Sequence, residues 1–174
     1  MKELAHYGFI LALICVIAAG LLAGVNALTK DKIAAQARFE EEAALKEIMP
    51  QAAKFVEKNP TPEISFYQAF DNQDKKIGFV FKASGKGYSS EIQTLVGMFL
   101  DGRISAIKVL SLNETPGLGM RVKEDGFTRQ FNNQEAMSLA NVQAITGATI
   151  SSRAVMDSII KKAQELKEYM QNEK

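Results

Sequence analysis

The chain has 174 residues and nearly balanced charge, with 21 Lys and Arg against 20 Asp and Glu. Its net charge therefore creates no strong electrostatic attraction to nucleic acid. Its length accommodates one ordinary domain and a membrane anchor. With one cysteine, Cys15, and one histidine, His6, the composition excludes a disulfide within one chain, a thiolate-held iron–sulfur cluster and a zinc site of the usual spacing. Redox chemistry would therefore require an organic cofactor or another subunit.

The first expected element is a membrane-spanning helix. No charged side chain occurs from Tyr7 to Thr29, and this stretch matches the roughly 20 apolar residues that cross a bilayer core. We therefore predict an N-terminal tail over residues 1–6 and a transmembrane helix over residues 7–29. A cleaved signal peptide is the alternative, since Lys2 precedes the run and Val25-Asn26-Ala27 resembles a cleavage site, but the apolar run is long for a signal peptide.

The charges around this helix leave its orientation open. Lys30, Lys32 and Arg38 follow the span, whereas Lys2 precedes it, and the positive-inside rule would then place the following domain in the cytoplasm. A short basic head is also typical of a signal anchor, and large domains are translocated despite their charges. The charge pattern alone supports both orientations equally.

Residues 30–62 are expected to form a helix leaving the membrane and then a linker. The stretch from Thr29 to Met49 is rich in Ala, Glu, Lys and Leu, and Pro50 ends it. The segment Asn59-Pro60-Thr61-Pro62 predicts a loop. Four apolar residues at helical spacing are expected to pack on the domain: Ile33, Ala37, Leu45 and Ile48.

Beyond residue 63 the hydrophobic period changes from helical to alternating, which predicts antiparallel strands. A first hairpin has a polar turn over residues 71–76, and these positions face one way: Ile64, Phe66, Gln68 and Phe70, then Ile77, Phe79 and Phe81. A second hairpin runs from Glu91 to Leu112 around Asp101-Gly102. That pair favours a tight turn in which both residues take positive φ.

Helices are expected after the second hairpin. Residues Met120 to Phe131 predict a short helix, and Ile150 to Met170 predict a terminal helix. One face of the terminal helix carries Val155, Ile159, Ala163 and Leu166. Antiparallel strands in the middle and helices at both ends predict an α+β domain over residues 63–174.

Three glycine-bearing segments are candidates for ligand binding: Gly85-Lys86-Gly87-Tyr88, residues 113–119 (NETPGLG) and residues 146–152 (TGATISS). None has the spacing of a dinucleotide fingerprint or a phosphate loop. The third lies where the terminal helix begins, and a helix start binds phosphate through its N–H groups and dipole, to which Arg153 could add a contact. Helix capping is the alternative role for its hydroxyl residues, Thr146, Thr149, Ser151 and Ser152.

The third segment also supports a family resemblance. Thr146-Gly147-Ala148-Thr149-Ile150-Ser151 resembles the Ser/Thr-Gly-Ala-Thr-x-Ser/Thr motif of the FMN-binding domains in RnfG subunits of Rnf complexes and in NqrC subunits of sodium-translocating NADH:quinone reductases. The segments 85–88 and 114–119 resemble that family's loops around the isoalloxazine ring. With the N-terminal anchor, the resemblance spans nearly the whole chain, whose length is closer to RnfG than to NqrC.

The resemblance implies FMN esterified through its phosphate to Ser151 by a flavin transferase, with Ser152 as the alternative acceptor. We further expect Leu118 and Met120 to lie against the flavin ring and Thr115 to contact its polar edge. The cofactor-binding residues implied besides Ser151 are Thr146, Gly147, Ala148, Thr149, Ser152, Gly85, Gly87, Tyr88, Glu114, Thr115, Pro116, Gly117, Leu118 and Gly119.

The resemblance further implies an electron-transfer subunit, without a substrate of its own, in a ferredoxin:NAD oxidoreductase that moves Na⁺ or H⁺ and supplies its membrane and redox partners. It places the protein in the cytoplasmic membrane as a single-pass protein whose domain faces the periplasm or cell exterior. Three alternatives are an NqrC-like subunit, an anchored binding module without flavin, and an anchored reductase of a small molecule. The reductase would need a proton donor, for which the candidates are Tyr88, Glu114 and Arg121.

Overall fold

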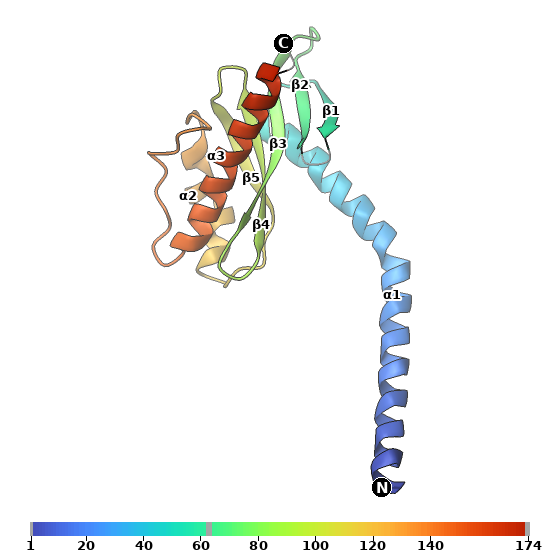
Figure 1. Cartoon of the computed structure of the whole chain (residues 1–174). Coiled ribbons are helices and arrows are strands. Elements are labelled where there is room, and N and C mark those ends of the chain that lie inside the picture. Colours follow the sequence, from blue (N-terminus) through green and yellow to red (C-terminus); the bar gives the residue numbers. More distant parts are fainter. Residues whose placement is uncertain (1, 62–63, 173–174) are drawn as a thin grey trace. The chain divides into compact units, whose positions relative to one another are not determined.

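The computed structural model describes residues 2–61 and 64–172, and the chain forms two compact units, Met1–Glu41 and Glu42–Lys174. The first unit is made by a single helix, α1 (Lys2–Ile48), whose last turns belong to the second unit (Figure 1). A window of α1 has a mean hydropathy of 2.7 and is 0% buried, so by length and composition the helix can cross a membrane. The helices predicted on either side of Thr29 are thus parts of one helix.

The second unit is built on a sheet of five strands in the order β1-β2-β3-β4-β5, each antiparallel to its neighbour. The strands are β1 (Lys54–Thr61), β2 (Ile64–Phe70), β3 (Lys76–Lys86), β4 (Glu91–Phe99) and β5 (Ile104–Ser111). Both predicted hairpins are present, as β2–β3 and β4–β5. Together with the terminal helix, this sheet confirms the predicted α+β fold.

The loop predicted at residues 59–62 is wrong for residues 59–61, because Asn59, Pro60 and Thr61 lie in β1, and Pro62 lies outside the described residues. A proline has no N–H for a sheet ladder, but an edge strand tolerates it, and β1 is an edge strand. The domain boundary proposed at residue 63 stays a prediction, although β1 precedes it.

The two faces of the sheet are covered by different helices. Helix α3 (Thr149–Asn172) lies across β3 and β4 on one face, as Figure 1 shows, and its predicted apolar residues Val155, Ile159, Ala163 and Leu166 are all buried there. The last turns of α1 cover the other face, where Leu45, Ile48 and Met49 pack with strand residues. Leu45 and Ile48 thus pack as expected, whereas Ile33 and Ala37 belong to the first unit, so their packing on the domain stays a prediction.

A polar contact reinforces the end of α1. The Ser105 hydroxyl donates to the Ile48 carbonyl at 2.8 Å, and Lys108 forms an ion pair with Glu47. A side chain at Gly97 would lie 2.4 Å from Ile48 Cγ2, so the helix end sits directly on the β4 backbone. The sheet therefore satisfies a helix-terminal carbonyl that has no partner within the helix.

Two details of the hairpins differ from expectation. Ile77 does not share a face with Phe79 and Phe81 but packs with the α1 side, because a β-bulge lies between its neighbours in the β2–β3 ladder. In the β4–β5 turn Gly102 alone has positive φ, at 88°. The Phe99 N–H donates to the Arg103 carbonyl, so residues 100–102 form a three-residue hairpin loop with glycine in the left-handed conformation. The expected two-residue turn is therefore wrong.

The segment between β5 and α3 closes the α3 side of the core. In place of the single short helix predicted over 120–131, it contains a 3-10 helix (Gly119–Lys123), α2 (Asp125–Thr128) and a second 3-10 turn (Arg129–Phe131). Its side chains Val122, Phe127 and Phe131 are buried in the core, and the Phe127 and Phe131 rings meet edge to face with centroids 5.2 Å apart.

Candidate functional site

The three glycine-bearing segments, far apart in the sequence, meet at the start of α3. Residues 85–88 end β3 and turn toward β4, residues 113–119 follow β5, and residues 146–152 lead into the first turn of α3. Because neighbouring strands are antiparallel, the end of β3, the start of β4 and the end of β5 lie at the same end of the strands. The topology therefore brings all three segments together.

One carboxylate joins the three segments. Glu114 Oε1 accepts hydrogen bonds from the N–H groups of Ser89 (3.0 Å) and Ser90 (2.9 Å). Its Oε2 accepts from the Tyr88 N–H at 3.2 Å and from Ser151 Oγ at 2.7 Å. Glu114 is only 4% exposed and Ser151 only 2% exposed, so these bonds are shielded from water.

The charge of Glu114 is stabilised by its hydrogen bonds. Burial alone would raise the pKa of its carboxyl, but the bonds from the Ser151 hydroxyl and from the N–H groups of Ser90, Ser89 and Tyr88 outweigh burial and hold the pKa below its ordinary value. Glu114 is therefore ionised at neutral pH and acts as an acceptor. This argues against Glu114 as the proton donor that a reductase would require.

Two glycines allow the close approach of these segments. A Cβ on Gly119 would lie 2.6 Å from Glu114 Oε2 and 2.7 Å from Ser151 Oγ, so no other residue fits between them without displacement. Gly147 has a φ of 82°, a left-handed conformation that favours glycine, in the turn before α3. The glycines thus shape the meeting point of the segments around Glu114.

A cleft of about 520 Å³ opens beside this meeting point. Its lining combines hydroxyl groups, backbone at the start of α3 and apolar side chains; the residues are Tyr88, Glu114, Thr115, Leu118, Gly119, Gly147, Ala148, Thr149, Ile150 and Ser151. Its volume is in the range of small-molecule and cofactor sites. Nine of the ten lining residues are predicted site residues, and Ile150 is the exception.

Comparisons with known proteins identify the family. The FMN-binding domain profile matches residues 87–164, and the profile of the RnfG N-terminal region matches residues 1–48. The G subunit of the proton-translocating ferredoxin:NAD(+) oxidoreductase complex of Clostridium ljungdahlii is 32% identical over 159 residues, which cover 86% of this chain and 84% of that protein. The chain belongs to the RnfG family. Its apolar helix α1 is accordingly a membrane anchor, and its second unit contains an FMN-binding domain.

Other RnfG relatives match over similar lengths. The G subunit of the Na(+)-translocating ferredoxin:NAD(+) oxidoreductase complex of Acetobacterium woodii is 32% identical, covering 91% of this chain and 89% of its own. The crystal structure of NqrC from Shewanella oneidensis superposes with a TM-score of 0.52 at 20% identity, covering 65% of this chain and 66% of that one, just under two thirds. This second likeness concerns the fold alone.

Several predicted site residues of this RnfG-family chain lie outside the cleft. Thr146 lines a neighbouring hollow of about 290 Å³, and Gly85 packs against α3, where a Cβ would lie 2.2 Å from the Ala154 carbonyl oxygen. Gly87 lies beside Glu114 Oε1, while Pro116, Gly117 and Met120 are absent from the described cleft lining. Close contacts at Gly85 and Gly87 and the positive φ of Gly117, at 74°, indicate that these three glycines shape the loops.

The adjacent hydroxyls of Ser151 and Ser152 have different surroundings. Both residues are inside the first turn of α3, which begins at Thr149, so neither occupies the capping position before the helix. Ser152 Oγ donates to the Ala148 carbonyl at 2.9 Å and accepts from the Ile145 N–H at 3.0 Å, which holds the preceding turn. Ser151 Oγ instead donates to Glu114 Oε2, and the residue lines the cleft.

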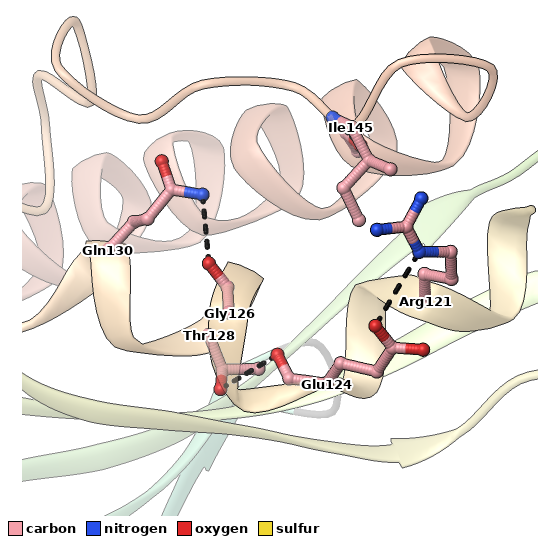
Figure 2. A network of polar contacts seen from close by, with 7 residues as sticks. Arg121, Glu124, Gly126, Thr128, Gln130 and Ile145 are labelled. Carbon is pink, nitrogen blue, oxygen red and sulfur yellow. Dashed lines mark hydrogen bonds and ion pairs between the residues drawn. The ribbon is translucent and has the colours of Figure 1, made fainter.

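The neighbouring hollow is bordered by a separate polar network (Figure 2). Arg121 Nε lies 3.5 Å from Glu124 Oε2, and Gln130 Nε2 donates to the Gly126 carbonyl at 3.2 Å. The Thr128 hydroxyl donates to the Glu124 carbonyl at 3.3 Å. Arg121 therefore forms an exposed ion pair at the neighbouring hollow and does not line the cleft.

The cleft suits the two chemically different ends of FMN. As at any helix start, the first N–H groups of α3 have no partner within the helix and favour an anionic group such as phosphate. Tyr88, Leu118 and Ile150 supply exposed apolar surface, at 72%, 46% and 56% exposure, for a flat aromatic ring. The predicted segments supply most of the residues that line this cleft, while Ile150, a variable position within the motif, carried no signal of its own.

Proposed function

We propose that this protein is the flavin-bearing subunit of an Rnf-type ferredoxin:NAD⁺ oxidoreductase in the cytoplasmic membrane. It passes electrons between other redox subunits, has no substrate of its own, and contributes to a complex that moves Na⁺ or H⁺. The observation that carries this proposal is the cleft at the start of α3, where three segments that resemble the family's flavin loops converge on Glu114. The family membership of the chain supports it.

The proposal includes a covalent bond between the FMN phosphate and Ser151, made by a flavin transferase. Ser151 lines the cleft within the first turn of α3, so a phosphate on its hydroxyl would remain near the helix start. Ser152 Oγ is bonded to backbone on both sides, and its use would disrupt the turn before α3. These contacts favour Ser151 over Ser152.

The flavin supplies one-electron and two-electron chemistry when it is bound, and the chain's own residues set its surroundings. A phosphate tether leaves the ring free of covalent change. Leu118 and Ile150 provide an apolar wall, and the Thr115 side chain provides a polar contact on the same cleft. Such surroundings favour one flavin charge state over another, which is how a protein adjusts a flavin potential.

The domain is proposed to face the periplasm or the cell exterior, with the other Rnf subunits and the flavin transferase as partners. A covalent bond keeps the cofactor in place where free FMN is not replenished. The coupling ion is a property of the complex: two relatives at 32% identity are named for proton and for Na(+) translocation, respectively. This subunit is therefore proposed to carry electrons in either kind of complex.

The decisive experiment compares Ser151→Ala with Ser152→Ala in cells that contain the attachment enzyme. Intact mass and fluorescence of the denatured full-length chain report covalent flavin. We expect one FMN increment on the wild type and on Ser152→Ala, and none on Ser151→Ala. An increment that persists in Ser151→Ala would move the acceptor, and a wild-type chain without any increment would contradict covalent attachment.

A further inference from the structure

The contact between Ser151 and Glu114 places a hydroxyl directly against a carboxylate. The distance from Ser151 Oγ to Glu114 Oε2 is 2.7 Å, and the two residues are separated by 37 positions in the sequence. Both are almost fully buried. A hydroxyl is a weak nucleophile unless a base lies within hydrogen-bond distance to take its proton, and 2.7 Å satisfies that requirement.

The orientation of this carboxylate is fixed by the turn that follows β3. The N–H groups of Ser89 and Ser90 hold Oε1, and the N–H group of Tyr88 holds Oε2 at 3.2 Å. Backbone groups cannot rotate away as side chains can, so Oε2 remains aimed at Ser151 Oγ. The same bonds keep the carboxylate ionised at neutral pH, in the form that accepts a proton.

The neighbouring hydroxyl shows why the carboxylate matters. Ser152 Oγ donates to a backbone carbonyl, that of Ala148, at 2.9 Å. An amide carbonyl is too weakly basic to take a proton from a hydroxyl during a reaction, whereas a carboxylate can serve as a general base. Of the two adjacent serines, Ser151 is the one whose proton has a base to receive it.

We propose that Glu114 is the base that activates Ser151 for flavin attachment, so that the chain supplies part of the catalysis of its own modification. This inference rests on the proposed covalent attachment to Ser151. The flavin donor must be a phosphoanhydride of FMN, such as a flavin dinucleotide, because a hydroxyl and a free phosphate monoester do not condense in water without activation.

The step balances with these groups. Ser151 Oγ forms a bond to the phosphorus of the FMN phosphate, and its proton passes to Glu114 Oε2. The anhydride bond from that phosphorus breaks, and the leaving nucleotide phosphate departs with the electron pair. No oxidation or reduction occurs. The transferase presents the donor and stabilises the leaving group.

The test follows attachment to the purified, unmodified full-length chain in detergent, with the transferase and flavin adenine dinucleotide, by intact mass over time. Glu114→Gln keeps the side-chain length and an oxygen for the N–H groups but cannot act as the base. We expect its maximal rate of attachment to fall about 100-fold or more, with the KM for the chain little changed. Glu114→Asp, which keeps the carboxylate, should restore part of the rate.

The matched control is Glu124→Gln, the same chemical change at the exposed ion pair with Arg121 outside the cleft (Figure 2), which should leave the rate unchanged. Thermal melting confirms that each variant is folded. A folded Glu114→Gln chain that is modified within about threefold of the wild-type rate would overturn the proposal. If the Gln variant does not fold, Glu114→Asp decides: a folded Asp chain that accepts no flavin overturns the proposal, and a partial rate supports it. A wild-type chain that accepts no flavin would instead refute the proposed function.

Discussion

Two hollows of similar size lie at opposite ends of α3, and they differ in what lines them. The cleft at the first turn, about 520 Å³, contains the buried and fully hydrogen-bonded Glu114. The hollow beside the last turns, about 450 Å³, is lined by Phe66, Phe79 and long flexible side chains such as Lys76 and Lys167. Volume alone therefore does not distinguish a ligand site here.

The difference lies in how firmly the polar groups are held. At the cleft, hydrogen bonds from backbone and a buried hydroxyl fix one carboxylate, and Gly87 and Gly119 lie close against it. At the other hollow, Lys76 is exposed and rests over the Phe79 ring, 5.3 Å from its centroid. A site requires convergent polar groups in fixed geometry, and only the first of these two hollows has them.

The largest effect is expected where the cleft depends on contact between β3 and α3. A Cβ on Gly85 would lie 2.2 Å from the Ala154 carbonyl oxygen, a backbone atom that can move only with the helix. Gly85→Ala should destabilise the chain by about 1–3 kcal/mol and slow flavin attachment, since the start of α3 would move away from Glu114. Thermal melting and intact mass measure the two effects.

The control for this substitution is Gly126→Ala. Gly126 lies in α2, and a Cβ there would meet nothing within 4 Å, so alanine should be neutral or stabilising by up to about 1 kcal/mol. Equal melting temperatures for the Gly85 variant and the wild type would show that α3 is not packed as tightly on β3 as the structure indicates.

A smaller effect is expected when the charge of Glu114 is removed by acid. The folded pKa lies below the ordinary value of 4.5, so ionised Glu114 contributes stability that is complete above that value. The contribution is lost as the pH falls below 4.5 and through the lower folded pKa. Over this pH range the melting temperature of the unmodified wild type should therefore fall by more than that of Glu114→Gln.

The two melting curves should converge toward low pH, because protonated Glu114 and glutamine are both neutral. Parallel curves would mean that Glu114 has the same pKa in the folded and unfolded chain. Unmodified protein is required, since a phosphoester on Ser151 removes the hydroxyl that donates to Glu114 at 2.7 Å. The measurement thereby tests the hydrogen bonds independently of any flavin chemistry.

These contrasts show what the sequence can and cannot predict. Period and length were sufficient for α3 and for four of the strands, because each pattern is local. The motif residues of the cleft were found by resemblance, but the function of Glu114 as their junction was not, because its partners lie 24 to 37 positions away along the chain. No local pattern encodes such contacts.

The missed strand and the displaced side chain have the same origin. Pro60 signals a loop when taken locally, and only its place at the edge of a sheet makes it compatible with β1. Likewise, alternation predicts one face for Ile77 and Phe79, and a β-bulge set by pairing with β2 separates them. Both errors concern where a strand lies in the sheet, which is a long-range property.

The smallest expected effect concerns the hollow at the far end of α3. Lys76→Met removes the cation over the Phe79 ring but keeps apolar contact, so it should cost no more than about 0.5–1 kcal/mol in unfolding free energy. Lys167→Met serves as its control, since the described structure shows no ring beneath that ammonium group, and it should stay within about 0.5 kcal/mol. Both variants should accept flavin at the wild-type rate, as judged by intact mass, because neither lysine lines the cleft at the first turn. A changed rate of flavin attachment in either variant would show that the second hollow also contributes to attachment, and would contradict the assignment of this function to the first-turn cleft alone.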